Sequence, residues 1–463
     1  MCRMKQALLT TLALGSVAIG LSCGQSSPPA TSPQSALPAA TATGQPTPTP
    51  AAVASYTDEQ LLGMFTNEFN LPLMKALVEL RKQDGRDNAL IFYTVAGKLT
   101  PDAKTWSAQS NLITEVIERG WTPQSAALLP LIQAFQPAFQ EIRKGAALDY
   151  AKNVGWGKGL DAPVPNFLTG QTSAKMLCVE GRYFESQNKH TEALDNYLAA
   201  LTMGRDFGAP GALLIGNLIS ASIQNVAVTP IYDCAAKGNL DRSALERLFA
   251  RLKVIESTQG SIAQSFQGEA ESSRQIFTLI RENPDEARKL LAQMLAFSPK
   301  FTPDDVIKQV DRIDSENKRI WEVVLRQIQI PYVKRDPTAL QQELAQALTG
   351  CHPFVTGGVP NYHEADTRFQ VMKTKLLEAE YAAALALFKL DKGRYPQQLS
   401  ELVATYFQAL PADPFSGAEF RYMGTPDGSR YGLYSIGPDK TDNRAAVRYD
   451  SKNGTLSAGD IFY

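Results

Sequence analysis

The sequence predicts a mainly α-helical protein in which an irregular or repeat-like all-α body is followed by a small α+β head. Apolar residues recur at three- and four-residue spacing through most of the chain after residue 56, which is the period of an amphipathic helix. Two short strand-like runs occur late in the chain, at 419–423 and 430–436. The chain has 463 residues, and single cores stop growing at roughly 250 to 300 residues, so we expect more than one core. The expected parts are a signal peptide at 1–22, a lipid-anchored disordered linker at 23–56, the helical body at 57–348, a connector at 349–366 and the head at 367–463.

The first 22 residues have the features of an export signal. Arg3 and Lys5 precede an uncharged, mostly apolar stretch that is too short and too rich in small residues to be a good membrane span. The run Gly20-Leu21-Ser22-Cys23 that ends it resembles the lipobox of bacterial lipoproteins, although Leu21 lies two residues before the cysteine instead of three. The resemblance implies a lipid on Cys23. The alternative is ordinary secretory cleavage here, which would leave a soluble periplasmic or secreted protein.

The segment after Cys23 has the composition of a spacer. From Gln25 to Ser55 there is no charged residue, and Pro, Ala, Thr, Ser and Gln dominate. Such a segment has too little apolar surface to offset the entropy lost on folding, so it is expected to stay extended and disordered. A lipid-anchored domain needs a tether of this kind, which strengthens the prediction for Cys23.

Helix starts can be located in the body by their capping residues. Thr57 precedes two acidic residues, and Thr122 precedes a proline at the first helical position. Pro130 and Pro137 are expected to kink or divide the helix that follows Thr122. The uncharged run 209–232 contains Asn, Ser and Gln side chains that would need partners in a membrane, so it is predicted to be a central buried helix. Further helices are expected at 240–257, 261–283, 285–297 and 304–328.

One segment of the body is similar to a tetratricopeptide repeat. Its small residues would let two antiparallel helices approach closely, and its aromatic residues would fill the space between them. We find no second copy at this spacing, so the sequence favours one helical hairpin inside an irregular domain. The residues that carry the pattern are Leu177, Gly181, Phe184, Ala193, Tyr197 and Ala200.

The residues of the body indicate no catalytic chemistry. We recognise no phosphate-binding glycine loop, nucleophile elbow or two-histidine zinc helix. Cys178 and Cys234 are expected to be buried free thiols, although one disulfide could form among them and Cys351. Four residues of the connector could in principle hold zinc: Cys351, His352, His363 and Glu364. Their spacing matches no compact zinc template.

The head begins with a long amphipathic helix from about Thr367 that ends at Gly393. A short helix at 399–407 and a hairpin through Pro426-Asp427-Gly428 are expected after it. The helix end Gly393-Arg394-Tyr395-Pro396, the turn Asp413-Pro414-Phe415 and the segment Tyr431 to Asp439 follow one another in the order seen in a known family, as does Gly459-Asp460-Ile461. This part resembles the periplasmic head of the major pseudopilins of type II secretion systems.

The resemblance implies a calcium site in the last loop. In that family, acidic side chains and backbone carbonyls of this loop bind calcium, which places Asp439 and Asp460 in that role, and Asp442 is a plausible third ligand. Arg444 and Arg448 depart from the family pattern, and turn aspartates that bind no metal are the alternative. The pilin processing site and its membrane helix are also missing, so polymerisation by the pilin route is not expected.

These observations predict a non-enzymatic interaction or structural module of the bacterial cell envelope, linked to secretion or surface assembly. Its expected partners are other envelope proteins, together with a membrane that it reaches through the lipid. A nucleic-acid partner is not expected, because the formal charge of −1 provides no concentrated positive surface. Apart from calcium, no cofactor is expected. The alternative function is a ligand-binding protein or an enzyme with a pocket in the helical body.

Overall fold

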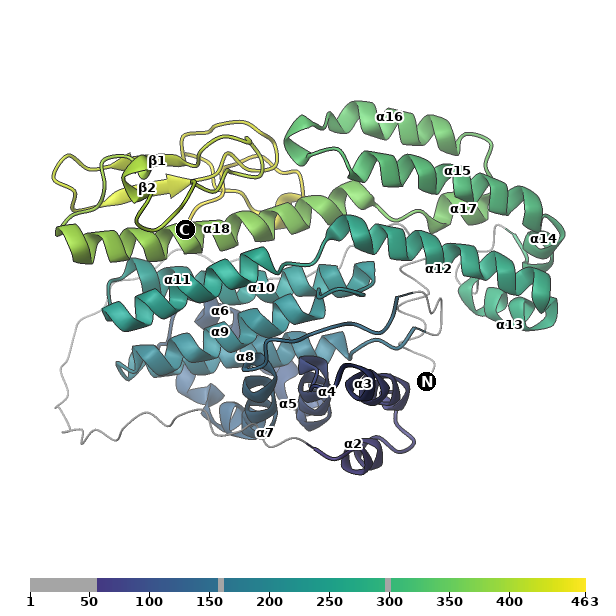
Figure 1. The fold of residues 1–463 in the computed structure, drawn as a ribbon, viewed down its shortest axis with the longest axis horizontal. Coiled ribbons are helices and arrows are strands. Elements are labelled where there is room, and N and C mark those ends of the chain that lie inside the picture. Colours follow the sequence, from purple (N-terminus) through teal and green to yellow (C-terminus); the bar gives the residue numbers. More distant parts are fainter. Residues whose placement is uncertain (1–55, 157–161, 296–300) are drawn as a thin grey trace.

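The computed structural model describes residues 56–156, 162–295 and 301–463. The predicted signal peptide, Cys23 and nearly all of the predicted linker lie outside these residues. Figure 1 shows a long helix, α18 (Tyr362–Lys392), that crosses the molecule, with most of the helical body on one side of it and a small β-hairpin on the other. The described chain is mainly α-helical, as predicted.

The body contains two groups of helices. The first group comprises α2 (Asp58–Met64), α3 (Leu71–Asp84), α4 (Ala89–Leu99), α5 (Ala103–Trp106), α6 (Ser110–Arg119), α7 (Leu129–Ala146), α8 (Phe167–Ser186), α9 (His190–Phe207), α10 (Leu214–Ala236) and α11 (Arg242–Ser257). The second comprises α12 (Ile262–Glu282), α13 (Pro284–Leu295), α14 (Pro303–Lys308), α15 (Val310–Ile328), α16 (Pro337–Leu348) and α17 (Pro353–Gly358). Short 3₁₀ helices are η1 (Ser107–Gln109), η2 (Pro123–Leu128), η4 (Tyr332–Lys334), η5 (Leu399–Leu402) and η6 (Ser451–Asn453).

The central helix of the first group is α10, which packs most extensively against α9, α18 and α8. Among the described residues it is the one helix long and apolar enough to cross a membrane, yet 67% of its most apolar window is buried inside the protein. The Asn217 side chain on α10 donates a hydrogen bond to Ser265 of α12. The prediction of a central buried helix near residues 209–232 is therefore confirmed.

Helix α18 enters four hydrophobic cores. It contributes Leu376 to the core of the first group, Phe369 to the core of the second group, and Tyr381 and Val371 to two smaller cores, the second of which also contains Tyr332 of η4. It begins at Tyr362, where Asn361 caps it, and not near Thr367. The predicted connector at 349–366 is therefore partly helical, because it contains α17 and the start of α18, and α18 packs against α12 and α15 of the body.

Helix ends follow the predicted capping chemistry in several places. Thr57 forms a reciprocal capping box with Gln60, and α18 ends at Gly393, whose φ of 73° is readily reached only without a side chain. The helix predicted after Thr122 is divided, because η2 comes first and Pro130 then lies in the first turn of α7. Pro137 lies inside α7 and does not end it.

The head has a shorter second helix than predicted. Residues 399–407 form only η5, which ends where Val403 adopts an extended conformation with φ −70° and ψ 149°, and the next residue, Ala404, has a left-handed φ of 70°. In the described residues, the sheet consists of β1 (Arg421–Gly424) and β2 (Tyr431–Tyr434), which pair antiparallel with Tyr422 opposite Leu433. The predicted hairpin is therefore confirmed, with shorter strands.

Candidate functional site

The three predicted calcium ligands lie in neighbouring segments of the head. Asp460 is fully buried, and its two carboxylate oxygens accept hydrogen bonds from the backbone N–H groups of Asn443 at 3.2 Å and Ala445 at 2.7 Å. Asp439 accepts from the N–H groups of Thr441 and Gly459. The head loop thus folds around these two carboxylates.

Asp442 is held by side chains as well as by backbone. It accepts hydrogen bonds from Arg421 Nε at 3.0 Å and from the Tyr434 hydroxyl at 3.1 Å, and its pKa is lowered mainly by the N–H group of Arg444. Burial raises the pKa of Asp460, and the negative charges of Asp442 and Asp439 raise it further, against the two N–H groups that lower it. The three carboxylates therefore lie close enough for the charges of Asp439 and Asp442 to influence the pKa of Asp460.

The present geometry of this loop does not fit a calcium ion. Calcium takes six to eight oxygen ligands, whereas the oxygens of these carboxylates accept N–H and O–H donors of the chain itself. Across the residues that the structure describes, no three His, Cys, Asp or Glu side chains are grouped so that they could hold a metal. Calcium would require Arg421 to release Asp442 and the backbone N–H groups to turn away.

The residues considered for zinc have separate roles. The sulfur of Cys351 accepts a hydrogen bond from Arg319 at 3.1 Å, and Nδ1 of His352 caps α17 by accepting from the Phe354 N–H. His363 stacks on Tyr332 with ring centroids 6.0 Å apart. Cys178, Cys234 and Cys351 are free thiols, and the first two are buried, as predicted for them.

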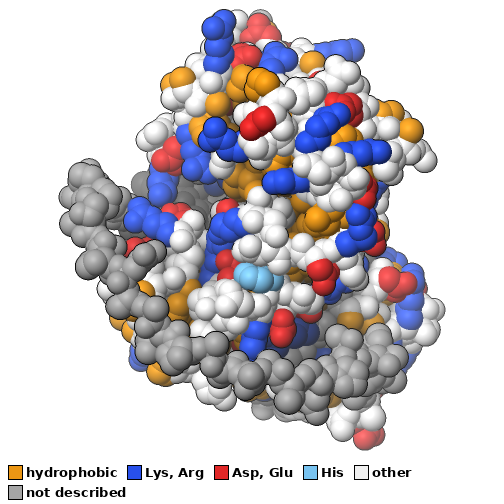
Figure 2. Space-filling model, turned by 90° about the vertical axis from the view of Figure 1, so that its left-hand side faces the viewer, with side chains coloured by type: hydrophobic (Ala, Val, Ile, Leu, Met, Phe, Trp, Pro, Cys, Tyr) orange, Lys and Arg blue, Asp and Glu red, His pale blue; other side chains and the backbone are white. Residues whose placement is uncertain are grey.

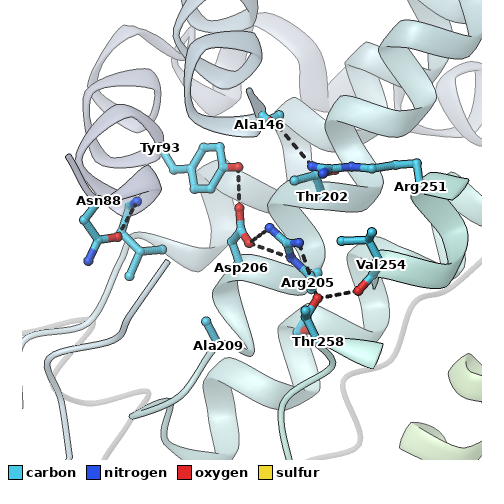
Figure 3. A network of polar contacts seen from close by, with 12 residues as sticks. Asn88, Tyr93, Ala146, Thr202, Arg205, Asp206, Ala209, Arg251, Val254 and Thr258 are labelled. Atoms are coloured by element: carbon cyan, nitrogen blue, oxygen red, sulfur yellow. Dashed lines mark hydrogen bonds and ion pairs between the residues drawn. The ribbon is translucent and has the colours of Figure 1, made fainter. Parts of the chain in front are cut away.

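A buried network of polar contacts ties four helices together (Figure 3). The hydroxyl of Tyr93 on α4 donates to Asp206 on α9 at 2.7 Å, and Arg205 pairs with the same carboxylate at 2.8 Å. Arg251 of α11 donates to the carbonyl of Ala146 at the end of α7 and to Thr202 of α9. A cation at the negative end of a helix is favourable, so these charges act as cross-links within the bundle.

A second buried network surrounds Arg182, whose side chain is fully inaccessible. Its guanidinium pairs with Glu185 at 3.0 Å and with Asp233 at 2.5 Å, and it donates to the carbonyl of Ile117 at the end of α6. The hydroxyl of Tyr197 donates to Glu185 at 2.8 Å. Each charge has a partner, so this network also stabilises the bundle.

Two carboxyl groups that no sequence motif marks have strongly altered environments. Glu269 of α12 accepts a hydrogen bond from Leu214 N–H at 3.0 Å, and burial raises its pKa to about 7. Glu378 of α18 is 1% exposed, and neither of its oxygens has a hydrogen-bond partner. The burial of Glu378 could have been predicted from the sequence. Glu378 lies with Glu380 in the apolar run 376–388, and a helix of this composition has little polar surface to expose to solvent.

No family model, curated protein or solved structure matches this chain.

Proposed function

We propose that this protein is a non-enzymatic lipoprotein of the bacterial cell envelope, which serves as an interaction or structural module in secretion or surface assembly. A lipid on Cys23 would hold it at a membrane, and the uncharged segment after Cys23 would act as its tether. The pseudopilin-like residues of the head support a link to secretion, because that family works in such a system.

The observation that carries this proposal is the continuity of α18 through the body and the head. Its residues enter both cores of the helical groups and both smaller cores that β2 and the last residues of the chain help to form. A head that shares a helix of this length with a bundle moves together with it, unlike a head on a flexible linker. Such a unit fixes the position of a binding surface relative to the membrane tether, which is what a structural module requires.

Exposed apolar side chains on the end of this unit support a protein partner. Figure 2 shows apolar side chains between basic and acidic ones on the end of the molecule that lies at the left in Figure 1. The end of α18 and the β1–β2 hairpin lie there, and they carry Leu390 at 51% exposure and Met423 at 59%. Interface cores combine such apolar side chains with a polar rim.

We expect the double variant Leu390→Lys and Met423→Lys to lose its envelope partners. A lysine at the centre of an interface must be desolvated without a partner, so recovery should fall about tenfold, which corresponds to about 1.4 kcal/mol of binding free energy. Cross-linking on membranes, pull-down and quantitative mass spectrometry would measure it. Leu168→Lys is the control, since Leu168 is 66% exposed on α8. Equal recovery with all three proteins, or no specific partner with the wild type, would contradict the proposal.

The calcium prediction can be tested on the full chain. The resemblance predicts that calcium raises the thermal midpoint Tm, that chelation lowers it, and that Asp460→Asn abolishes both shifts. A Tm that responds to neither treatment would show that the three carboxylates serve only the hydrogen bonds seen here.

A ligand-binding protein or an enzyme with a site in the body is the second candidate. It is favoured by Glu269, whose pKa near 7 is suited to proton transfer at neutral pH. Its contact with the first N–H group of α10 places it at the positive end of that helix.

A further inference from the structure

A carboxyl group without a partner lies where the head meets the body. Glu378 is in the middle of α18, it is 1% exposed, and both of its oxygens are buried without a hydrogen-bond donor. The hydroxyl of Thr374, one helical turn earlier, is fully buried and also lacks a partner. Buried polar groups are nearly always hydrogen-bonded in proteins, so this group calls for a physical explanation.

Tyrosine side chains from the body and the head lie near Glu378. Tyr232 belongs to α10, Tyr431 belongs to β2, and Tyr463 stacks on Tyr232 with ring centroids 4.2 Å apart and an interplanar angle of 19°. Burial is the largest cause that raises the pKa of all three phenols, and a charge on Glu378 would raise each of them further, so the phenols lie near it. We call this contact of Glu378, Tyr232, Tyr431 and Tyr463 the Glu378 seam.

The charged groups near Glu378 would not fully compensate a negative charge on its carboxylate. Burial is the largest influence and raises its pKa well above the usual range; Asp413 raises it further, while Lys375, the Ser435 backbone N–H and Arg448 lower it. No hydrogen bond joins Glu378 to either cation. An ionised carboxylate in such a site is very costly, and buried groups avoid this cost by staying neutral. The closed seam therefore holds Glu378 as a carboxylic acid.

We propose that Glu378 makes the docking of β2 and the C-terminal residue Tyr463 against α10 and α18 depend on proton uptake. When the seam opens, Glu378 enters water, where its carboxyl group ionises above about pH 4.3. Its folded-state pKa is raised, so its contribution to the closed state is fully present below about pH 4.3 and is lost as pH rises through the folded-state value. Higher pH thus favours the open seam.

The exchange of two backbone amides can report the opening. Ser435 and Ile461 donate hydrogen bonds to each other's carbonyls, at 3.0 and 2.9 Å, and the Ser435 backbone lies beside Glu378. Hydrogen exchange of the full chain, followed by mass spectrometry, would measure the opening constant in peptides that contain these residues. The wild type is compared with Glu378→Gln at each pH. The pH dependence of the intrinsic exchange rate then cancels in the ratio of the two opening constants.

We expect the opening constant of the wild type to rise up to tenfold per pH unit relative to Glu378→Gln, because opening releases one proton. Glu380→Gln is the matched control, because Glu380 is 3% exposed on the same helix but faces Glu256 and Lys253 of α11. It should follow the wild type. Glu378→Leu, which is neutral and apolar, should behave as Glu378→Gln and serves if that variant does not fold. The proposal would be overturned if the opening constant of the wild type, divided by that of Glu378→Gln, did not change with pH.

Discussion

Replacing Arg182 with Met is expected to destabilise the protein by about 3 to 5 kcal/mol, the usual cost of removing one partner of a buried ion pair. Arg182 is fully buried, and it is the cation that faces both Glu185 and Asp233 inside the bundle. Without it, the carbonyl of Ile117 also loses two donors. The change in the free energy of unfolding can be measured by urea denaturation with circular dichroism.

The matched control for this variant is Arg119→Met. Arg119 is 61% exposed and pairs with Glu115 at 3.8 Å one turn away on α6. Exposed pairs of this kind contribute about 1 kcal/mol or less. If Arg182→Met were as mild as Arg119→Met, the buried network around Arg182 would not be a principal support of the bundle.

Gly181→Ala is the second substitution with a large expected effect. A Cβ atom at position 181 would lie 2.2 Å from Cε1 of Tyr197, far closer than atoms can approach. The Tyr197 ring has little room to move, because it is fully buried and its hydroxyl donates to Glu185. Overpacking of this kind costs about 1 to 3 kcal/mol, which urea denaturation would detect.

A double-mutant cycle separates this clash from other effects. Tyr197→Leu removes the ring, so Gly181→Ala should cost much less in that background than in the wild type. Gly63→Ala is the control, since Gly63 lies in α2 with no atom within 4 Å of the added Cβ. It should be neutral or stabilising, because alanine favours a helix. Equal costs of Gly181→Ala in both backgrounds would refute the close approach of α8 and α9.

Features that depend on neighbouring residues could be predicted from the sequence. The caps at Thr57 and Gly393 and the Gly181–Tyr197 contact between α8 and α9 agree with the structure. Each of these signals arises within one helix or one hairpin. The same holds for the β1–β2 hairpin, whose turn residue Gly428 has a φ of 66°.

Features that depend on distant residues could not be predicted. Arg182 contacts Ile117 and Asp233, which are 65 and 51 positions away, and no local pattern reveals such pairs. The sequence placed Asp439, Asp442 and Asp460 in one loop region, but which donors their oxygens accept depends on the loop conformation. Ala445, for example, adopts a left-handed φ of 57°. The environment of Glu378 likewise arises only when β2 and Tyr463 pack against α10.

Membrane fractionation of the wild type and Cys23→Ser is the most direct test of whether this protein works as a lipid-anchored module of the envelope. A lipid on Cys23 predicts that the wild type sediments with membranes and that Cys23→Ser appears in the soluble fraction. Mass spectrometry of the N-terminal peptide should then show the mass of a lipid on Cys23 in the wild type. Continued association of Cys23→Ser with membranes, or an unmodified Cys23 in the wild type, would contradict the lipid anchor.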